Sequence, residues 1–149
     1  KDLNVKFDFP EAVIDSPEKY VPLSEVIDSN VDDKYFFSQK AVDGMMRNRE
    51  SMNKGRAQNI DEPCNTVGAH LAKVSLNSTD PVLMVDNKYR RFTPREVARI
   101  QSFPETFKLT ESEHAQYKAL GNAIPPVMFW YIMKSVKSSL CLEGECQKS

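Results

Sequence analysis

The strongest constraint on folding lies in the stretch LGNAIPPVMFWYIM at residues 120–133. A Gly-Asn pair ahead of two prolines indicates a tight turn, and a proline at the first helical position favours the start of a helix. The segment that follows is apolar on nearly every helical face through Met133 and becomes amphipathic only from Lys134. Because a helix without a polar face is buried on most sides, we expect a helix over 125–139 that needs another surface to cover it. A chain of 149 residues with little predicted strand offers few such surfaces.

Two capping boxes predict the helices that precede this turn. In Thr93-Pro94-Arg95-Glu96 the threonine oxygen can accept from the Glu96 amide, while the Glu96 carboxylate reaches back to the Thr93 amide. We expect this helix over 94–103, because Pro104 follows it. The sequence TESE at 110–113 repeats the pattern and predicts a helix over 111–119, with Gly121 as the residue just past its C-terminal cap.

The region before residue 90 predicts a small lobe of mixed structure. Ser38 can cap a helix over 39–51, and the polar segment 52–63 has the composition of a loop. Residues 66–76 have a strand-like pattern, NSTDP at 77–81 indicates a turn, and VLMV at 82–85 is a second strand. We therefore expect a fold of mixed α and β type, with a β-hairpin formed by 66–76 and 82–85.

The charges are distributed unevenly along a chain whose formal net charge is only −1. Residues 1–33 are acidic and interrupted by three prolines, which predicts an extended connector with one short helix near 23–28. Residues 34–56 carry a net charge of +4, and residues 87–101 hold five basic side chains against Glu96 alone. Two basic islands suit a phosphate-facing surface, although charge alone fits a pair of solvated faces at least as well.

The cysteines and the hydropathy exclude several classes of protein. Cys64, Cys141 and Cys146 have no paired spacing, which argues against a disulfide framework and fits a reducing, cytoplasmic compartment. No histidine accompanies them at ligand spacing, so no metal site is predicted. No apolar stretch approaches the ~18 residues of a membrane span. The start at Lys1, without an initiator methionine, suggests a processed chain, a cloned domain or a fragment.

The pairing of RRFTPREVARIQSFPETF at 90–107 with YKALGNAIPP at 117–126 resembles the ninth and tenth signature motifs of the DNA (cytosine-5) methyltransferases. Every fixed position of the ninth motif is met between Arg91 and Pro104, and 121–125 fit the tenth. KYFFSQKAVDGMMRNRE and EPCNTVGAH resemble, more loosely, segments of the family's target-recognition region. The resemblance covers roughly 34–140 and is strongest over 90–133.

This resemblance implies a division of the chain and a role for each part. Residues 1–33 would be a connector, 34–90 part of the target-recognition domain, 91–140 the C-terminal motifs and closing helix, and 141–149 a polar tail. In the family the closing helix completes a Rossmann-like domain that binds S-adenosylmethionine. The residues implied to contact the cofactor are Gly121, Asn122, Ala123 and Ile124. The candidates for contact with duplex DNA are Thr66, Lys54, Arg56 and Arg91, and those that hold the motif together are Thr93, Arg95, Glu96 and Gln101.

Several of the family's N-terminal motifs are absent, namely Phe-x-Gly-x-Gly, Glu-Asn-Val and Gln-x-Arg-x-Arg. Pro63-Cys64 mimics the dipeptide that holds the family's nucleophile, but no Glu-Asn-Val follows it to protonate the ring, so we interpret Cys64 as a structural thiol. We therefore expect no catalytic residue in this chain, an N-terminal catalytic part or large subunit as partner, and self-association of the isolated chain. The alternative is a non-catalytic, sequence-specific DNA-binding module, which would have no use for a cofactor-facing turn.

Overall fold

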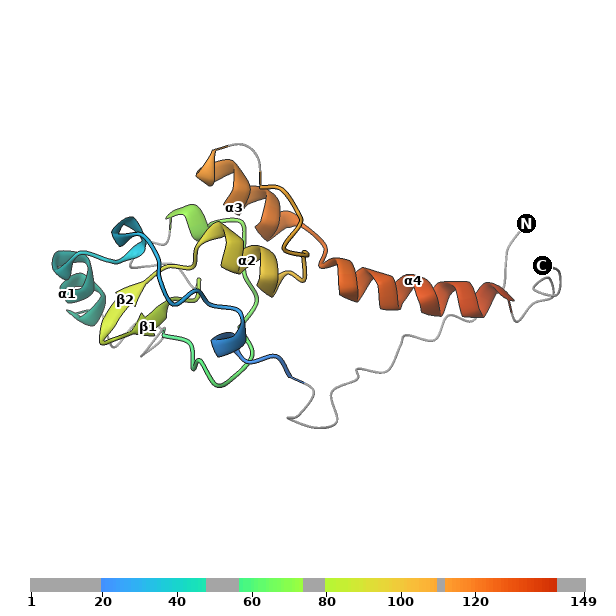
Figure 1. Ribbon diagram of the computed structural model, residues 1–149, viewed down its shortest axis with the longest axis horizontal. Coiled ribbons are helices and arrows are strands. Elements are labelled where there is room, and N and C mark those ends of the chain that lie inside the picture. Colours follow the sequence, from blue (N-terminus) through green and yellow to red (C-terminus); the bar gives the residue numbers. More distant parts are fainter. Residues whose placement is uncertain (1–19, 48–56, 74–79, 110–111, 142–149) are drawn as a thin grey trace. The chain divides into compact units, whose positions relative to one another are not determined.

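The computed structural model describes residues 20–47, 57–73, 80–109 and 112–141 (Figure 1). The chain separates into two compact units, one of which comprises residues 20–123 and is called the body here. The second unit includes residues 124–141, most of which form one long helix. The helices and strands of the body are η2 (Leu23–Glu25), η3 (Asp33–Tyr35), α1 (Gln39–Arg47), η4 (Leu71–Lys73), β1 (Leu83–Val85), β2 (Lys88–Arg90), α2 (Pro94–Ile100) and α3 (Glu113–Asn122).

The β-hairpin of the body is formed by β1 and β2, which pair antiparallel with Leu83 opposite Arg90 and Val85 opposite Lys88. Asp86 and Asn87 connect them with φ of 51° and 62°, and positive φ at both central residues is the conformation that a two-residue hairpin turn requires. The predicted pairing of 66–76 with 82–85 was therefore wrong. Residues 66–68 are irregular and Leu71–Lys73 is a 3-10 helix, while residues 74–79 lie outside the described residues.

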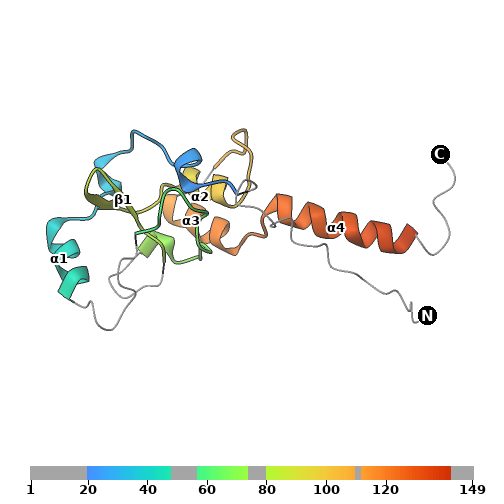
Figure 2. The same cartoon turned by 90° about the horizontal axis from the view of Figure 1, so that it is seen from below.

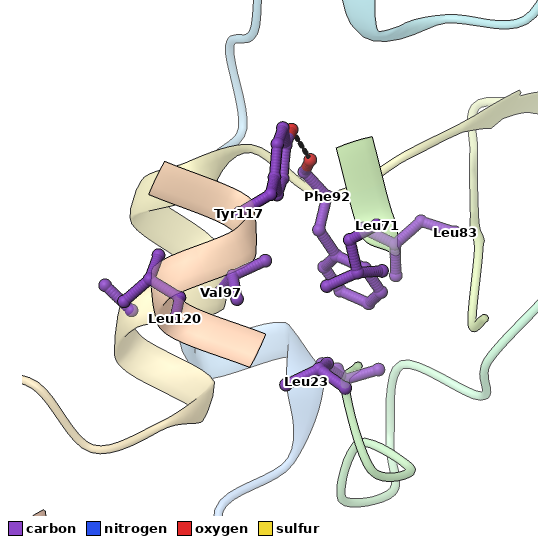
Figure 3. Packing of buried hydrophobic residues seen from close by; sticks show 9 residues of the cluster. Leu23, Leu71, Leu83, Phe92, Val97, Tyr117 and Leu120 are labelled. Atoms are coloured by element: carbon purple, nitrogen blue, oxygen red, sulfur yellow. Dashed lines mark hydrogen bonds between the residues drawn. The ribbon is translucent and has the colours of Figure 1, made fainter. Parts of the chain in front are cut away.

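The core of the body combines side chains from segments far apart in the sequence, from Leu23 to Leu120 (Figure 3). Phe92, Leu83 and Leu71 lie close together, and Tyr117 donates a hydrogen bond of 2.5 Å to the Phe92 carbonyl. Val67 and Leu71, four residues apart, both enter this core. Their burial explains why a segment with a strand-like pattern adopts irregular and 3-10 structure instead. The core also includes Leu23, Val97, Ala98 and Leu120.

Helices α2 and α3 lie side by side (Figures 1 and 2). The predicted capping box is confirmed at α2, with Thr93 as N-cap and Pro94 as the first helical residue. α2 ends at Ile100, three residues before the predicted end, and Ser102 adopts a φ of 62° just beyond it. The predicted helix over 111–119 is shifted along the chain. Ser112 is the N-cap, and α3 continues to Asn122, so Gly121 lies within the helix and not past its end.

Residues 20–33 are an integral part of the body, although an extended connector was predicted there. Leu23 is buried, its amide donates to the Glu62 carbonyl at 3.0 Å, and η2 supplies the short helix expected near 23–28. α1 begins at Gln39 as predicted, and the Ser38 hydroxyl accepts from the Ala41 amide at 3.4 Å. The last part of the predicted helix, residues 48–51, lies outside the described residues.

The helix of the second unit is α4, Pro126–Cys141, close to the predicted range of 125–139. Its large apolar side chains are exposed, and they include Val127, Met128, Phe129, Trp130, Tyr131 and Met133. Trp130 and Tyr131 meet edge to face with ring centroids 4.9 Å apart. Within the described part of the chain, no helix has the length and apolar character needed to cross a membrane.

Candidate functional site

The carboxylate of Glu96 is the centre of a buried polar network. It accepts two hydrogen bonds from the Arg90 guanidinium, at 2.7 and 2.9 Å, and neither residue is exposed to solvent. It also accepts from the backbone amides of Thr93 and Asp28, each at 2.7 Å. One carboxylate therefore joins the hairpin, the start of α2 and the segment that follows η2. A buried charge of this kind is tolerated because its partner and its hydrogen bonds are all supplied.

Arg99 makes a second set of contacts between α2 and the N-terminal segment. Its guanidinium lies 2.7 Å from Asp28 Oδ1, donates to the Val26 carbonyl at 2.9 Å, and lies 2.6 Å from Glu105 Oε1. The hydrogen bond to Glu105 raises the pKa of Arg99 most, and the hydrogen bond to Asp28 raises it further. In turn, the hydrogen bond from Arg99 lowers the pKa of Glu105.

Arg95 and Gln101 connect α2 to the segments that come after it. Arg95 donates to the Phe107 carbonyl at 2.9 Å, and its Nη1 is buried without a hydrogen-bond partner among the described residues. Gln101 is buried, and its amide nitrogen donates to the Leu120 carbonyl at 2.8 Å. The ninth-motif segment thus holds the last turn of α3, which includes Gly121 and Asn122.

Gly121 fills a different role from the one predicted. Its φ is not in the left-handed region, so the turn does not require glycine for conformational freedom. A Cβ at this position would lie 2.3 Å from both the carbonyl carbon and the oxygen of Gly68, and 2.4 Å from the amide nitrogen of Ala69. Glycine is required at residue 121 because the backbone of another segment passes directly against α3.

Asn122 is the last residue of α3, and Ala123 and Ile124 follow it. The Asn122 side chain is exposed, and Ala123 caps α3 by donating its amide to the Leu120 carbonyl at 3.2 Å. Ile124 is 59% exposed. Residues 121–124 therefore carry no charged side chain and one side-chain amide, that of Asn122.

An apolar pocket of about 310 Å³ lies beside the face of α3 that is opposite Gly121. The pocket is lined by three alanines four residues apart, Ala115, Ala119 and Ala123, a spacing that places them on one side of a helix. Ala123 is the one residue of the predicted cofactor-contacting set in the pocket lining. The remaining lining residues are Phe103, Phe107, Lys108, Leu109, Gln116 and Leu120.

Of the residues predicted to contact DNA, the structure describes Thr66 and Arg91. Thr66 is exposed on the irregular segment just before Val67 and Gly68, whereas Lys54 and Arg56 lie outside the described residues. Arg91 has partners within the chain: it lies 3.5 Å from Glu113 Oε1, and its guanidinium carbon is 5.5 Å from the centre of the Tyr35 ring.

Cys64 has the surroundings of a structural thiol. It is partly buried against the core, and this burial raises the pKa of the thiol to about 12. Because a thiolate is the reactive form, a thiol with this pKa is a poor nucleophile near neutral pH. Across the described ranges, no group of three or more His, Cys, Asp or Glu side chains is arranged to hold a metal ion.

Two residues important to this site were not singled out by sequence reasoning. Arg90 belongs to a run of basic residues, and nothing local in the sequence distinguishes it from its solvent-facing neighbours. Gly68 stands in the segment Thr-Val-Gly-Ala, where an isolated glycine can indicate close approach of another backbone. That signal was available, but it does not reveal the partner.

The family model for C-5 cytosine-specific DNA methylase matches residues 6–138 of the chain. The chain therefore belongs to this family of methyltransferases. It is 41% identical over 81 residues to the type II methyltransferase M.AplI of Arthrospira platensis, a match that covers 54% of this chain and 24% of that protein. It is 31% identical over 174 aligned positions to the type II methyltransferase M.FnuDI of Fusobacterium nucleatum, covering 99% of this chain and 50% of M.FnuDI.

The fold is also similar to that of a solved methyltransferase. The crystal structure of S. pombe Dnmt2 methyltransferase matches with a TM-score of 0.65 at 18% identity, over 80% of this chain and 42% of that one. The similarity supports a mixed α and β fold of the methyltransferase type. The chain spans half the length or less of these relatives, so the activity of a complete enzyme does not follow from the match alone.

Proposed function

We propose that this chain is the target-recognition and C-terminal part of a DNA (cytosine-5) methyltransferase. The complete enzyme would transfer the methyl group of S-adenosylmethionine to carbon 5 of a cytosine flipped out of a specific duplex DNA sequence. The observation that carries the proposal is the hydrogen bond from Gln101 to Leu120, which ties the two motif-bearing segments together next to the exposed turn. A binding module without methyl-transfer chemistry would have no need to hold that turn in place.

Residues 121–124 would form one wall of the cofactor site. The Asn122 amide can donate and accept hydrogen bonds, and Ala123 and Ile124 offer apolar contact to the rest of the cofactor. Four residues with one polar side chain supply too few groups to bind S-adenosylmethionine, so the other walls must come from a catalytic part. This fit supports a shared site. When bound, S-adenosylmethionine supplies the methyl group.

The exposed segment around Thr66 would contact DNA, together with the basic side chains of Lys54 and Arg56. Phosphate contacts position a protein on the duplex, and contacts to base edges choose the sequence. Arg91 would contribute less to phosphate binding than its charge predicts, because Glu113 and Tyr35 already engage it. The attacking thiolate would come from the catalytic part, since Cys64 is held as a neutral thiol.

The first test measures methyl transfer to duplex DNA with labelled S-adenosylmethionine. The purified chain alone should be inactive, and activity should appear when a catalytic part from a close relative is added. Robust turnover by the chain alone would contradict the assignment of the nucleophile to another part. Sequence-specific DNA binding by the chain, with no activity in any such combination, would instead favour the non-catalytic DNA-binding module.

A second test separates the two ligands in the active combination. Asn122→Ala removes an amide from a cofactor site without replacement, which should cost ~1–3 kcal/mol and weaken S-adenosylmethionine binding tenfold or more. The ratio of cognate to noncognate DNA affinity should remain as in the wild type. Thr66→Val should lower that ratio and leave the cofactor affinity unchanged. If Asn122→Ala changed DNA preference and spared the cofactor, the proposed roles would be wrong.

A further inference from the structure

Gly121 allows the backbone after the exposed Thr66 to lie in direct contact with the end of α3. Gly121 approaches the backbone of Gly68 and Ala69 so closely that a methyl group would lie 2.3 Å from Gly68 atoms. These are main-chain atoms, which cannot rotate out of the way as the end of a flexible side chain could. Thr66 is two residues before this contact, and Asn122 is one residue after it.

Both sides of the contact are fixed by buried neighbours. On one side, Val67 and Leu71 are buried in the core, so the backbone between them has little freedom to retreat. On the other side, Leu120 is buried in the same core and Gln101 holds its carbonyl. A displacement of one segment must therefore be accommodated by the other, because packed interiors resist small changes of volume.

We infer that Gly121 is a positioning residue that couples the cofactor turn to the recognition segment. This inference rests on the proposed function for its ligands, whereas the contact itself does not depend on them. Binding of S-adenosylmethionine at residues 121–124 would restrict the backbone of residues 66–69, and thereby favour one conformation of the segment that carries Thr66. Asn122 would contact S-adenosylmethionine and Thr66 would contact DNA, whereas Gly121 would influence the binding of both ligands.

The geometry is asymmetric, and this provides a matched control. A Cβ on Gly68 would have Asp80 Oδ1 as its nearest neighbour, at an ordinary contact distance of 3.4 Å, and no atom of α3 within 4 Å. The same glycine-to-alanine change should therefore disturb the contact when made at residue 121 and leave the contact in place when made at residue 68. Alanine is the better helix former, so helix propensity alone would make Gly121→Ala more stable than the wild type.

The first experiment uses the chain by itself. Gly121→Ala should lower the melting temperature and speed amide hydrogen exchange at both 67–69 and 120–123, whereas Gly68→Ala should change exchange at 120–123 by less than about twofold. A higher melting temperature for Gly121→Ala, or faster exchange in only one of the two segments, would overturn the inference. This result is independent of whether the chain binds DNA or cofactor.

The second experiment needs no variant, and so it also decides the matter if Gly121→Ala fails to fold. S-adenosylmethionine alone is added to the wild-type chain combined with a catalytic part, and amide exchange is followed. Exchange should slow at 67–69 as well as at 121–124, while α1 serves as the internal reference. Protection confined to 121–124 would overturn the coupling. The absence of cofactor binding by the wild-type combination would instead count against the proposed function.

Discussion

The body and α4 distribute polar and apolar groups in opposite ways. In the body, the charged side chains of Arg90 and Glu96 are fully enclosed, and each is satisfied by partners from the same unit. In α4, Phe129, Trp130 and Tyr131 are all 43% exposed or more. Charged groups are costly to bury and aromatic groups are costly to expose, so each arrangement requires an explanation.

The sequences of the two regions specify different things. The body has its own core and supplies every partner of the Glu96 carboxylate, so its sequence specifies a structure that can form within this unit. The sequence of α4 specifies an apolar surface whose complement is not supplied by α4 itself. This fits the proposal that the enzyme is completed by a catalytic part, against which such a helix would be buried.

The largest expected effect is at the buried carboxylate. Glu96→Gln keeps the size of the side chain but leaves the Arg90 guanidinium buried without a counter-charge, and turns an amide donor toward groups that are themselves donors. The free energy of unfolding should fall by ~3–5 kcal/mol, measured by urea denaturation. Glu105→Gln is the matched control, because Glu105 also pairs with an arginine but its side chain is 61% exposed. An equal, small effect of both changes would show that enclosure of the charge does not matter here.

The next effect concerns the apolar surface of α4. Burying an aromatic side chain of this kind is worth about 2 kcal/mol, so the isolated chain should self-associate through α4. Trp130→Ser should weaken that association by roughly thirtyfold, measured by sedimentation, without changing the melting temperature of the body. Lys137→Ala, on the same helix, should have little effect. A monomeric wild-type chain whose Trp130 is fully accessible to a soluble quencher would contradict this prediction.

A smaller effect is expected from one hydroxyl group in each region. Tyr117→Phe removes the buried hydrogen bond to the Phe92 carbonyl and should lower the free energy of unfolding by ~1 kcal/mol. Tyr131→Phe removes a hydroxyl from an exposed residue of α4 and should be neutral in the same assay. If the two changes had equal effects on unfolding, the contrast between the regions would not extend to single hydrogen bonds.

The smallest effect is the pH dependence of the exposed pair between Arg99 and Glu105. Because the pKa of Glu105 is lowered from its ordinary value of 4.5, the pair contributes its stabilisation above that value. The contribution is lost as the pH falls through the lowered pKa. The difference in melting temperature between the wild type and Glu105→Gln should therefore shrink between pH 6 and pH 3, and a difference that grew over this interval would be inconsistent with the ion pair.

The elements that sequence reasoning predicted well are those fixed by local chemistry. The capping box at Thr93 and Glu96 joins residues three apart, so the sequence contains both partners of each hydrogen bond. The hairpin was placed wrongly because the apolar residues of 66–76 resemble a strand, although Asp86-Asn87 between two short β-type segments was the better turn signal.

The tertiary contacts around residues 121–124 were not predictable from the sequence in the same way. The family resemblance pointed to residues 121–124, but the partner that requires glycine at 121 lies more than fifty residues earlier in the sequence. The burial of Arg90 depends on Asp28, Glu96 and the hairpin together. Contacts of that kind arise from the tertiary fold, and no short window of the sequence contains them.

The hydrogen bonds from α2 to the N-terminal segment also determine when this chain can fold. Asp28 is separated from Glu96 by 68 residues, and Val26 from Arg99 by 73. At a synthesis rate of roughly 5–20 residues per second, about 4–14 seconds pass between translation of the two sides of these contacts. Until α2 leaves the ribosome, Leu23 has no complete core to enter. Slower synthesis or a lower growth temperature lengthens this interval, so the yield of folded protein should depend on chaperones that shield an unfinished core.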